Sequence, residues 1–469
     1  MNDPRWASID AFAETNRDNI LRDISRLCAV PSVEGKPEPG APFGPGPRDA
    51  LAKALEIAAE LGLDTHNADN YIGWAETGPI AGGQKFLATI THTDVVPEGN
   101  GWDADPYTVR LRDGWLLGRG VADDKGPSIL CLYALKYLKD SGAALRYPVR
   151  ALLGANEETG MLDVDYYAEH FEMPAFCFTP DAEFPVCNGE KGGFNGEIVS
   201  PVLTGGAIVD FAGGVAHNAV PDRAYCVVRA AADAFHPGEG VTLEDNGDGT
   251  VTLRGWGKSG HAAMPEGTVN AIGLLVGCLL DSGICSPAET AYLNVLQKLH
   301  AASDGSALGI AADDGLFDPL TIIGGTIELR DGALRQSFDC RYPTNTDADR
   351  LTAAMTAAMT AVCGSAAHLE EVSSRVPFYI PADSPAIQTL IRTYNEVTGE
   401  DKQPFTMGGG TYARHFPFAV SFGPEHTDLP LPDFAGPMHG ANEGASFDKL
   451  IEALKIYILA LLRLQELEL

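Results

Sequence analysis

Short apolar runs of strand length alternate with longer runs of helical periodicity through the first part of the chain. Strand-like runs at 86–91, 149–155 and 175–178 alternate with a helix-like run at 128–139. Parallel strands need a long connection between them, generally a helix, so this alternation is typical of an α/β layer. The pattern predicts a mainly parallel sheet flanked by helices.

The pattern changes near residue 194 and returns near residue 384. Between these points lie short alternating runs such as 225–229, mixed with helix-like runs at 268–280 and 346–362. This texture is typical of an α+β domain, and because the α/β pattern resumes after it, the second domain interrupts the first. We therefore expect a main domain in two parts, 1–193 and 384–469, with an inserted domain at 194–383.

The composition narrows the functions that the chain can have. Its 469 residues are too many for one ordinary core, and 45% of them are hydrophobic. A formal net charge of −31 would repel nucleic acid and anionic membrane surfaces, so the expected partner is a small molecule or peptide. The N-terminus lacks a basic flank before an apolar core, and the apolar run 456–462 is too short to span a bilayer. We expect a cytoplasmic protein.

Polar runs follow several of the strand-like stretches. In an open α/β sheet, ligands bind beyond the carboxyl ends of the strands, and these runs are expected to lie there. His92 and Asp94 are two residues apart, so on extended backbone their side chains point the same way, and a carboxylate so placed commonly orients a metal-binding imidazole. The runs are 91–94, 118–126, 156–158 and 180–181.

The acidic residues of these runs are suited to holding cations. Asp123 lies in a glycine-rich loop and could bridge two cations, while the adjacent carboxylates of Glu157 and Glu158 would repel each other unless positive charge lay nearby. One glutamate could ligate a metal while the other acts as general base on a metal-bound water. Asp181 and a loop histidine, His439, would complete the set. Each residue alone also fits a solvated turn, a helix cap or a surface position, but their joint occurrence predicts a two-metal hydrolase.

The order of these runs resembles that of the dinuclear zinc peptidase family, which includes aminoacylases, glutamate-type carboxypeptidases and carnosinases. The long insertion and the runs 190–192 and 408–414 resemble the bacterial dipeptidase V branch most. The motifs that carry the resemblance are His92-Thr93-Asp94, Gly118-Arg119-Gly120 through Lys125, Glu157-Glu158, Pro180-Asp181 and Met438-His439-Gly440.

The resemblance implies two divalent cations per chain. His92, Asp123 and Asp181 would hold one cation, and Asp123, Glu158 and His439 would hold the other, with Asp123 as the bridge. Asp94 would support His92, and Glu157 would take a proton from the bridging water and pass it to the leaving amine. Mixed histidine and carboxylate ligands suit zinc, although manganese or cobalt fits the same set.

The inserted domain resembles the lid of the same family. The resemblance implies that His261 stabilises the oxyanion of the tetrahedral intermediate and that Asn218 and Arg341 bind substrate. Arg341 could fork onto a terminal carboxylate, with a surface salt bridge as the alternative. The backbone of Gly409, Gly410 and Thr411 could cradle the other end of a short substrate.

These observations predict a metal-dependent dipeptidase that cleaves short peptides with a free N-terminus through a metal-bridging hydroxide and a glutamate base. An amidohydrolase that removes acyl groups from amino acids is the alternative among enzymes. A non-catalytic metal- or peptide-binding protein is the alternative of another class. The resemblance to the dipeptidase V branch favours a monomer over a homodimer.

Overall fold

The computed structural model describes residues 3–364, 367–425 and 429–469, which form two compact units. The chain leaves the first unit, builds most of the second and then returns. The first unit is Met1–Asn188, Tyr379–Phe405 and Gly410–Leu469, and the second is Gly189–Phe378 and Thr406–Gly409. The boundaries at 194 and 384 stay a prediction of where separate domains divide.

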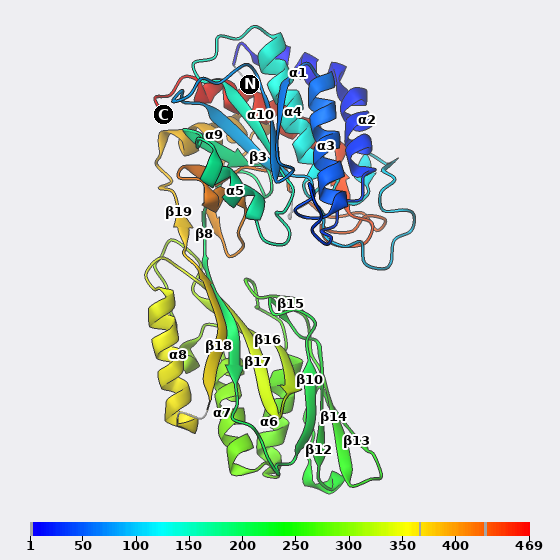
Figure 1. Cartoon of the computed structure of the whole chain (residues 1–469), viewed down its shortest axis with the longest axis vertical. Helices are drawn as coiled ribbons and strands as arrows, with labels where there is room; N and C mark the ends of the chain where they lie inside the picture. The colour runs from blue at the N-terminus through cyan, green and yellow to red at the C-terminus, as the bar shows by residue number, and fades with distance from the viewer. Residues whose placement is uncertain (1–2, 365–366, 426–428) are drawn as a thin grey trace. The chain divides into compact units, whose positions relative to one another are not determined.

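The first unit is built on one large sheet whose central strands are parallel (Figure 1). β3 pairs in parallel with β6 and with β7, and β21 pairs in parallel with β7. The predicted α/β layer is confirmed, with antiparallel strands outside this parallel centre. In sheet order the strands are β1 (Asp64–Ala68), β2 (Ile72–Glu76), β6 (Val149–Gly154), β3 (Leu87–His92), β7 (Phe176–Thr179), β21 (Ala419–Ser421), β8 (Cys187–Glu190) and β19 (Phe378–Tyr379), and β20 (Phe405–Met407) pairs with β8.

Helices and a small second sheet complete the first unit. The helices α4 and α10 pack on each other and are buried along nearly their whole length. A three-stranded sheet of β4 (Arg110–Arg112), β5 (Trp115–Leu117) and β22 (Gly444–Ser446) precedes α10. The helices are α1 (Trp6–Thr15), α2 (Arg17–Cys28), α3 (Pro45–Glu60), α4 (Lys125–Asp140), α5 (Leu162–His170), the 3-10 helix η3 (Tyr412–His415), α9 (Pro385–Thr398) and α10 (Phe447–Leu464).

The second unit is an antiparallel sheet with helices packed on it. Alternate residues of β12 are buried (Ala224, Cys226 and Val228), as expected for a sheet with one covered face. Its eight strands, in sheet order, are β13 (Val241–Asp245), β14 (Thr250–Trp256), β12 (Arg223–Arg229), β10 (Ile208–Gly213), β16 (Thr321–Arg330), β17 (Ala333–Tyr342), β9 (Gly192–Val199) and β18 (His368–Arg375). The helices are α6 (Ala271–Ser282), α7 (Pro287–Ala301) and α8 (Ala348–Cys363), with 3-10 helices η1 (Ala232–Ala234) and η2 (Ser306–Leu308), and β11 (Ala219–Val220) pairs with β15 (Gly260–His261).

Among the described residues, no helix has the length and apolar character needed to cross a membrane.

Candidate metal centre

Three parallel strands end at one edge of the first unit's sheet, and polar residues follow each end. His92 is the last residue of β3 and lies opposite Gly154, the last residue of β6, so the segment with Glu157 and Glu158 begins beside it. Asp181 follows the end of β7. Because parallel strands share their carboxyl edge, the register collects side chains that are far apart in the sequence.

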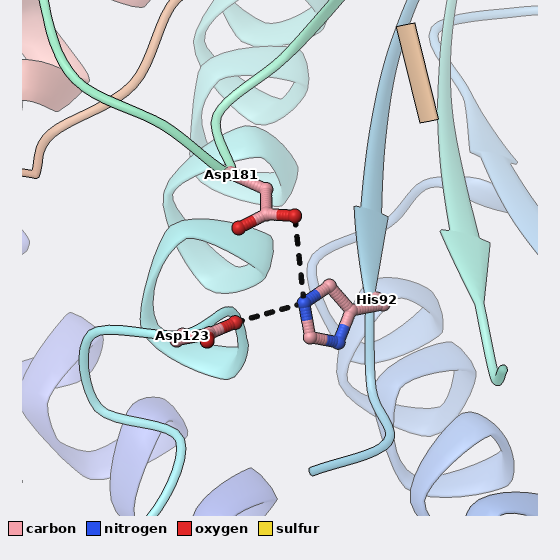
Figure 2. Close-up of side chains that lie close together, drawn as sticks. All are labelled: His92, Asp123 and Asp181. Atoms are coloured by element: carbon pink, nitrogen blue, oxygen red, sulfur yellow. Dashed lines mark ion pairs between the residues drawn. The ribbon is translucent and has the colours of Figure 1, made fainter. Parts of the chain in front are cut away.

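His92, Asp123 and Asp181 form the first cluster (Figure 2). His92 Nε2 lies 2.9 Å from Asp123 Oδ1 and 3.9 Å from Asp181 Oδ2. Both His92 and Asp123 are buried, yet His92 Nε2 and Asp123 Oδ1 have no partner in hydrogen-bond geometry among the described residues. Buried polar atoms are rarely left so, and an imidazole nitrogen with two carboxylates is a donor set that a divalent cation satisfies.

Asp123, Glu158 and His439 form the second cluster. His439 Nε2 lies 2.8 Å from Asp123 Oδ2 and 3.3 Å from Glu158 Oε2. Glu158 Oε1 is also buried without a hydrogen bond within the described part of the chain. Asp123 therefore faces one imidazole with each of its carboxylate oxygens, as a carboxylate shared by two cations would.

The two clusters hold more negative charge than positive. Three carboxylates lie among two imidazoles in these clusters, and Glu157, next to Glu158, adds a fourth. Burial together with the charge of Asp181 holds the pKa of Glu157 well above its usual range. Burial and the nearby Asp123 raise the pKa of Asp181 to about 7. Like charges in a buried site disfavour ionisation, and divalent cations would supply the missing positive charge.

The imidazoles respond to the same carboxylates in the opposite direction. Hydrogen bonds with Asp123 and Glu158 raise the pKa of His439 to about 11. Burial opposes a charge on His92, but its contacts with Asp123 and Asp94 still raise the pKa of His92 well above the usual range. The contacts of each imidazole with neighbouring carboxylates therefore outweigh burial in both cases.

Asp94 does more than the sequence predicts. His92 Nδ1 lies 3.0 Å from the backbone oxygen of Asp94 and 3.5 Å from its carboxylate Oδ1. The same carboxylate accepts hydrogen bonds from the backbone N–H groups of Glu157, at 3.2 Å, and Glu158, at 3.1 Å. Asp94 thus fixes the backbone of the two glutamates as well as lying beside His92.

Asp163 is a residue that sequence reasoning missed. Its buried carboxylate accepts hydrogen bonds from the backbone N–H groups of Ala155, at 2.6 Å, and Asn156, at 2.9 Å, and from the hydroxyl of Tyr412. These contacts fix the segment that leads to Glu157. Burial raises the pKa of Asp163 to about 6. The only signal in the sequence is an acid shortly after Glu157-Glu158, which is too common to interpret.

Two of the predicted lid residues lie next to each other in the second unit. His261 is in β15 and pairs with Ala219 of β11, and the carbonyl of the preceding residue, Asn218, accepts a hydrogen bond from Ala262 N–H at 2.9 Å. The side chain of His261 is exposed, and its Nδ1 accepts a hydrogen bond from Ala263 N–H at 3.2 Å. Asn218 and His261 therefore belong to one local substructure.

Arg341 is buried in β17 rather than exposed on the surface. Its guanidinium makes two contacts with Asp339, Nε to Oδ1 at 2.6 Å and Nη2 to Oδ2 at 3.0 Å, while Nη1 donates to the Gly408 carbonyl at 3.4 Å. Nε and Nη2 of Arg341 are thus already paired with a carboxylate of its own chain, while Nη1 faces the Gly408 carbonyl.

The glycine run after Gly408 divides between the units. Gly409 belongs to the second unit, whereas Gly410 and Thr411 belong to the first. Thr411 Oγ1 lies 3.1 Å from Ser421 Oγ and caps η3 by accepting from Ala413 N–H at 3.1 Å. The start of η3 is therefore anchored on β21.

Comparison with known families gives one match that covers most of the chain. A family model described as Peptidase family M20/M25/M40 matches residues 88–463. The chain is 32% identical over 472 residues to Beta-Ala-Xaa dipeptidase of Lactobacillus delbrueckii subsp. lactis, with 97% of both chains covered.

Solved structures with a similar fold include two dipeptidases. Human carnosine dipeptidase 1 matches with a TM-score of 0.61 and 15% identity, covering 99% of this chain and 100% of the other. Aminoacylhistidine dipeptidase from Vibrio alginolyticus matches with a TM-score of 0.59 and 14% identity, covering 95% of this chain and 96% of the other. At these identities the likeness concerns the fold.

Proposed function

This chain belongs to Peptidase family M20/M25/M40, and from that premise we propose that it is a metal-dependent dipeptidase acting on short peptides with a free N-terminus. The observation that carries the proposal is the placement of Asp123, whose two oxygens face His92 and His439 separately. A relative aligned over nearly the whole chain is named a Beta-Ala-Xaa dipeptidase, which supports the substrate class.

We propose two cation sites per chain, one of His92, Asp123 and Asp181 and one of Asp123, Glu158 and His439. Zinc suits these ligands, and manganese or cobalt would fit them as well. When bound, the cations supply Lewis-acid polarisation of the scissile carbonyl and activation of water.

Glu157 is the proposed general base. It adjoins Glu158 of the second cluster without belonging to either ligand group, and burial and the charge of Asp181 raise the pKa of its carboxyl, which makes the carboxylate a stronger base. In the proposed reaction its carboxylate accepts a proton from the attacking water and delivers it to the leaving amine. Asp94 orients the glutamate by holding its backbone N–H.

Residues outside the ligand clusters supply the proposed substrate contacts. His261 would stabilise the oxyanion, Asn218 and Arg341 would bind the substrate, and the backbone of Gly409, Gly410 and Thr411 would cradle one end of it. Asp339 holds Nε and Nη2 of Arg341, so the guanidinium would contact the substrate through Nη1 and not through the predicted fork. A monomeric state and a cytoplasmic location stay predictions.

A substrate panel tests the function. Protein purified without chelators is analysed for metal and assayed on free dipeptides, N-acetylated dipeptides and N-acetylated amino acids. Two cations per chain and hydrolysis of the free dipeptides alone are expected. Hydrolysis of the N-acetylated amino acids would favour a deacylase, and absence of any hydrolysis by the metal-loaded protein would contradict both enzymatic readings.

A further inference from the structure

A buried ion pair joins the two loops of the first unit that carry Asp123 and His439. Glu443 and Arg119 have exposed fractions of 0% and 1%, and Glu443 Oε2 lies 2.7 Å from Arg119 Nη1. Neither residue belongs to the ligand clusters. Removing two charges from water costs free energy, so a buried ion pair at this position needs a structural explanation.

The carboxylate of Glu443 holds the loop that precedes α4. Its Oε1 accepts hydrogen bonds from the backbone N–H groups of Gly120 at 3.1 Å, Ala122 at 2.9 Å and Asp123 at 3.3 Å. Three donors converging on one oxygen fix the loop as a unit. The last of these donors is the N–H of Asp123 itself, the carboxylate shared by both clusters.

The guanidinium of Arg119 holds the other loop. Its Nη2 donates to the backbone carbonyl of His439 at 3.3 Å and also lies within 3.3 Å and 3.4 Å of the carbonyls of Pro97 and Glu98. The pair therefore links the backbone of Asp123, through Glu443, to the backbone of His439, through Arg119.

The His439 loop needs such an anchor. His439 and Asn442 have φ values of 61° and 55°, a left-handed conformation that is uncommon for residues other than glycine, although histidine and asparagine adopt it more readily than most. The His439 side chain is 56% exposed, so packing does little to hold its imidazole. Backbone contacts, among them the one from Arg119, must hold it instead.

The first cluster is held differently. His92 is part of β3, and its strand is hydrogen-bonded on both sides to β6 and β7. Asp123 is also supported independently of Glu443, because Gly126 N–H donates to Gly120 at 3.0 Å and Ser128 N–H donates to Asp124 at 2.8 Å at the start of α4. Loss of the pair would therefore affect His439 far more than His92.

We propose that Glu443 and Arg119 are positioning residues that hold His439 in register with Asp123 and so set the affinity of the second cation site. The inference rests on the ligand sets proposed above. Outer residues that orient metal ligands typically change metal affinity by about 10–100-fold when replaced. An effect of that size is expected for the second cation, with the first cation bound nearly as in the wild type.

Calorimetric titration of the metal-free full-length protein with Co²⁺ tests this, because it reads binding and not turnover. The wild type should bind two ions, and Glu443→Gln should bind one with unchanged affinity and the second about 10–100-fold more weakly. In Glu443→Gln an amide N–H₂ must face either Arg119 or the three backbone donors, so one set of contacts is lost. Wild-type affinity for both ions in this folded variant would overturn the proposal.

Two further variants keep the result decisive. If Glu443→Gln does not fold, as judged by circular dichroism, Arg119→Lys takes its place, since it retains the charge but not the fork that reaches His439. It should weaken the second ion only, and unchanged binding would again overturn the proposal. Glu76→Gln is the matched control, because it breaks a buried Arg150 pair of β2 and β6 far from the ligands and should leave both affinities unchanged.

His439→Ala separates this inference from the proposed function. It removes a ligand directly and should abolish the second ion. If His439→Ala still binds two ions, the ligand sets themselves are wrong. If His439→Ala loses one ion while the Glu443 and Arg119 variants keep both, the ligand sets stand and the positioning pair is rejected.

Discussion

Histidines whose Nε2 atom is buried have opposite pKa shifts in the two units. In the first unit His92 lies among carboxylates, which raise its pKa well above the usual range despite burial. In the second unit His300 of α7 lies beside an apolar core, and burial lowers its pKa to about 4, only partly offset by Gln336. Burial is common to both, so the difference lies in the neighbours. In the first unit the carboxylates favour the charged form of His92, whereas in the second unit burial favours the neutral form of His300.

The largest effect is expected from removing the carboxylate that both clusters share. Asp123→Asn leaves each imidazole of the two clusters without its closest acid, at 2.9 Å for His92 and 2.8 Å for His439. Loss of both cations and of hydrolysis is expected, while the second unit stays folded. Metal analysis after gel filtration measures this, with the surface variant Asp10→Asn as control. Retention of two cations would contradict the shared role of Asp123.

Replacement of Glu157 should remove the reaction and keep the cations. For Glu157→Gln we expect kcat to fall by about 10²–10⁴-fold, since a general acid–base group contributes on that order. Metal content should stay at the wild-type level because Glu157 is not in either ligand group. Steady-state kinetics with parallel metal analysis measures both. Wild-type turnover would reject Glu157 as the base.

Chelation should destabilise the two units unequally. A bound cation whose free concentration is about 100 times its Kd adds roughly 2.7 kcal/mol to the free energy of unfolding. Removing it leaves the clustered carboxylates of the first unit without countercharge. Hydrogen exchange with and without chelator should show faster exchange in 156–158 and 436–443 and little change in α6 and α7. Equal acceleration in both units would break the comparison.

A pH dependence of the unfolding free energy is expected from the second unit. His300 has a pKa of about 4 when folded and about 6.5 when unfolded, so the unfolded chain binds the extra proton first. The stability from the neutral imidazole is fully present above pH 6.5 and is lost as the pH falls toward 4, by at most about 3 kcal/mol. His300→Gln should flatten this part of the curve.

Denaturant unfolding of the metal-free wild type and of His300→Gln between pH 4 and 7 measures this difference. Use of metal-free protein removes the proton release that accompanies cation binding in the first unit. The control is His170→Gln, because His170 is an exposed histidine at the end of α5. Identical slopes for wild type and His300→Gln would mean that His300 gains its proton without cost in the folded state.

Local patterns predict much of the fold. The strand-like runs 86–91 and 149–155 correspond to β3, Leu87–His92, and β6, Val149–Gly154, and the helix-like run 128–139 lies within α4, Lys125–Asp140. The placement of polar residues at strand ends was equally readable, since the carboxyl edge of a parallel sheet is a general binding position. The structure brings together His92, Asp123 and Asp181, and Asp123, Glu158 and His439, in the groups that the resemblance implied.

The contacts that hold these residues in place could not be predicted from local sequence patterns. Two examples are the hydrogen bonds of Asp94 to the N–H groups of Glu157 and Glu158 and the pairing of Asp339 with Arg341. Both depend on which backbone segments lie side by side after folding. Glu443 and Arg119 are 324 residues apart, and no sequence pattern indicated that they form an ion pair. From the sequence alone a charged residue is expected to be exposed to solvent, and only the structure shows that it is buried.

The sequence by itself determined the layer type of the first unit and indicated the residues that we propose carry the chemistry, because periodicity and residue type are local properties. The tertiary structure alone decided that Asp123 faces two histidines and that buried carboxylates hold the loops around it. These features depend on the register of β3 with β6 and on the meeting of two distant loops, which are long-range contacts that no local pattern encodes.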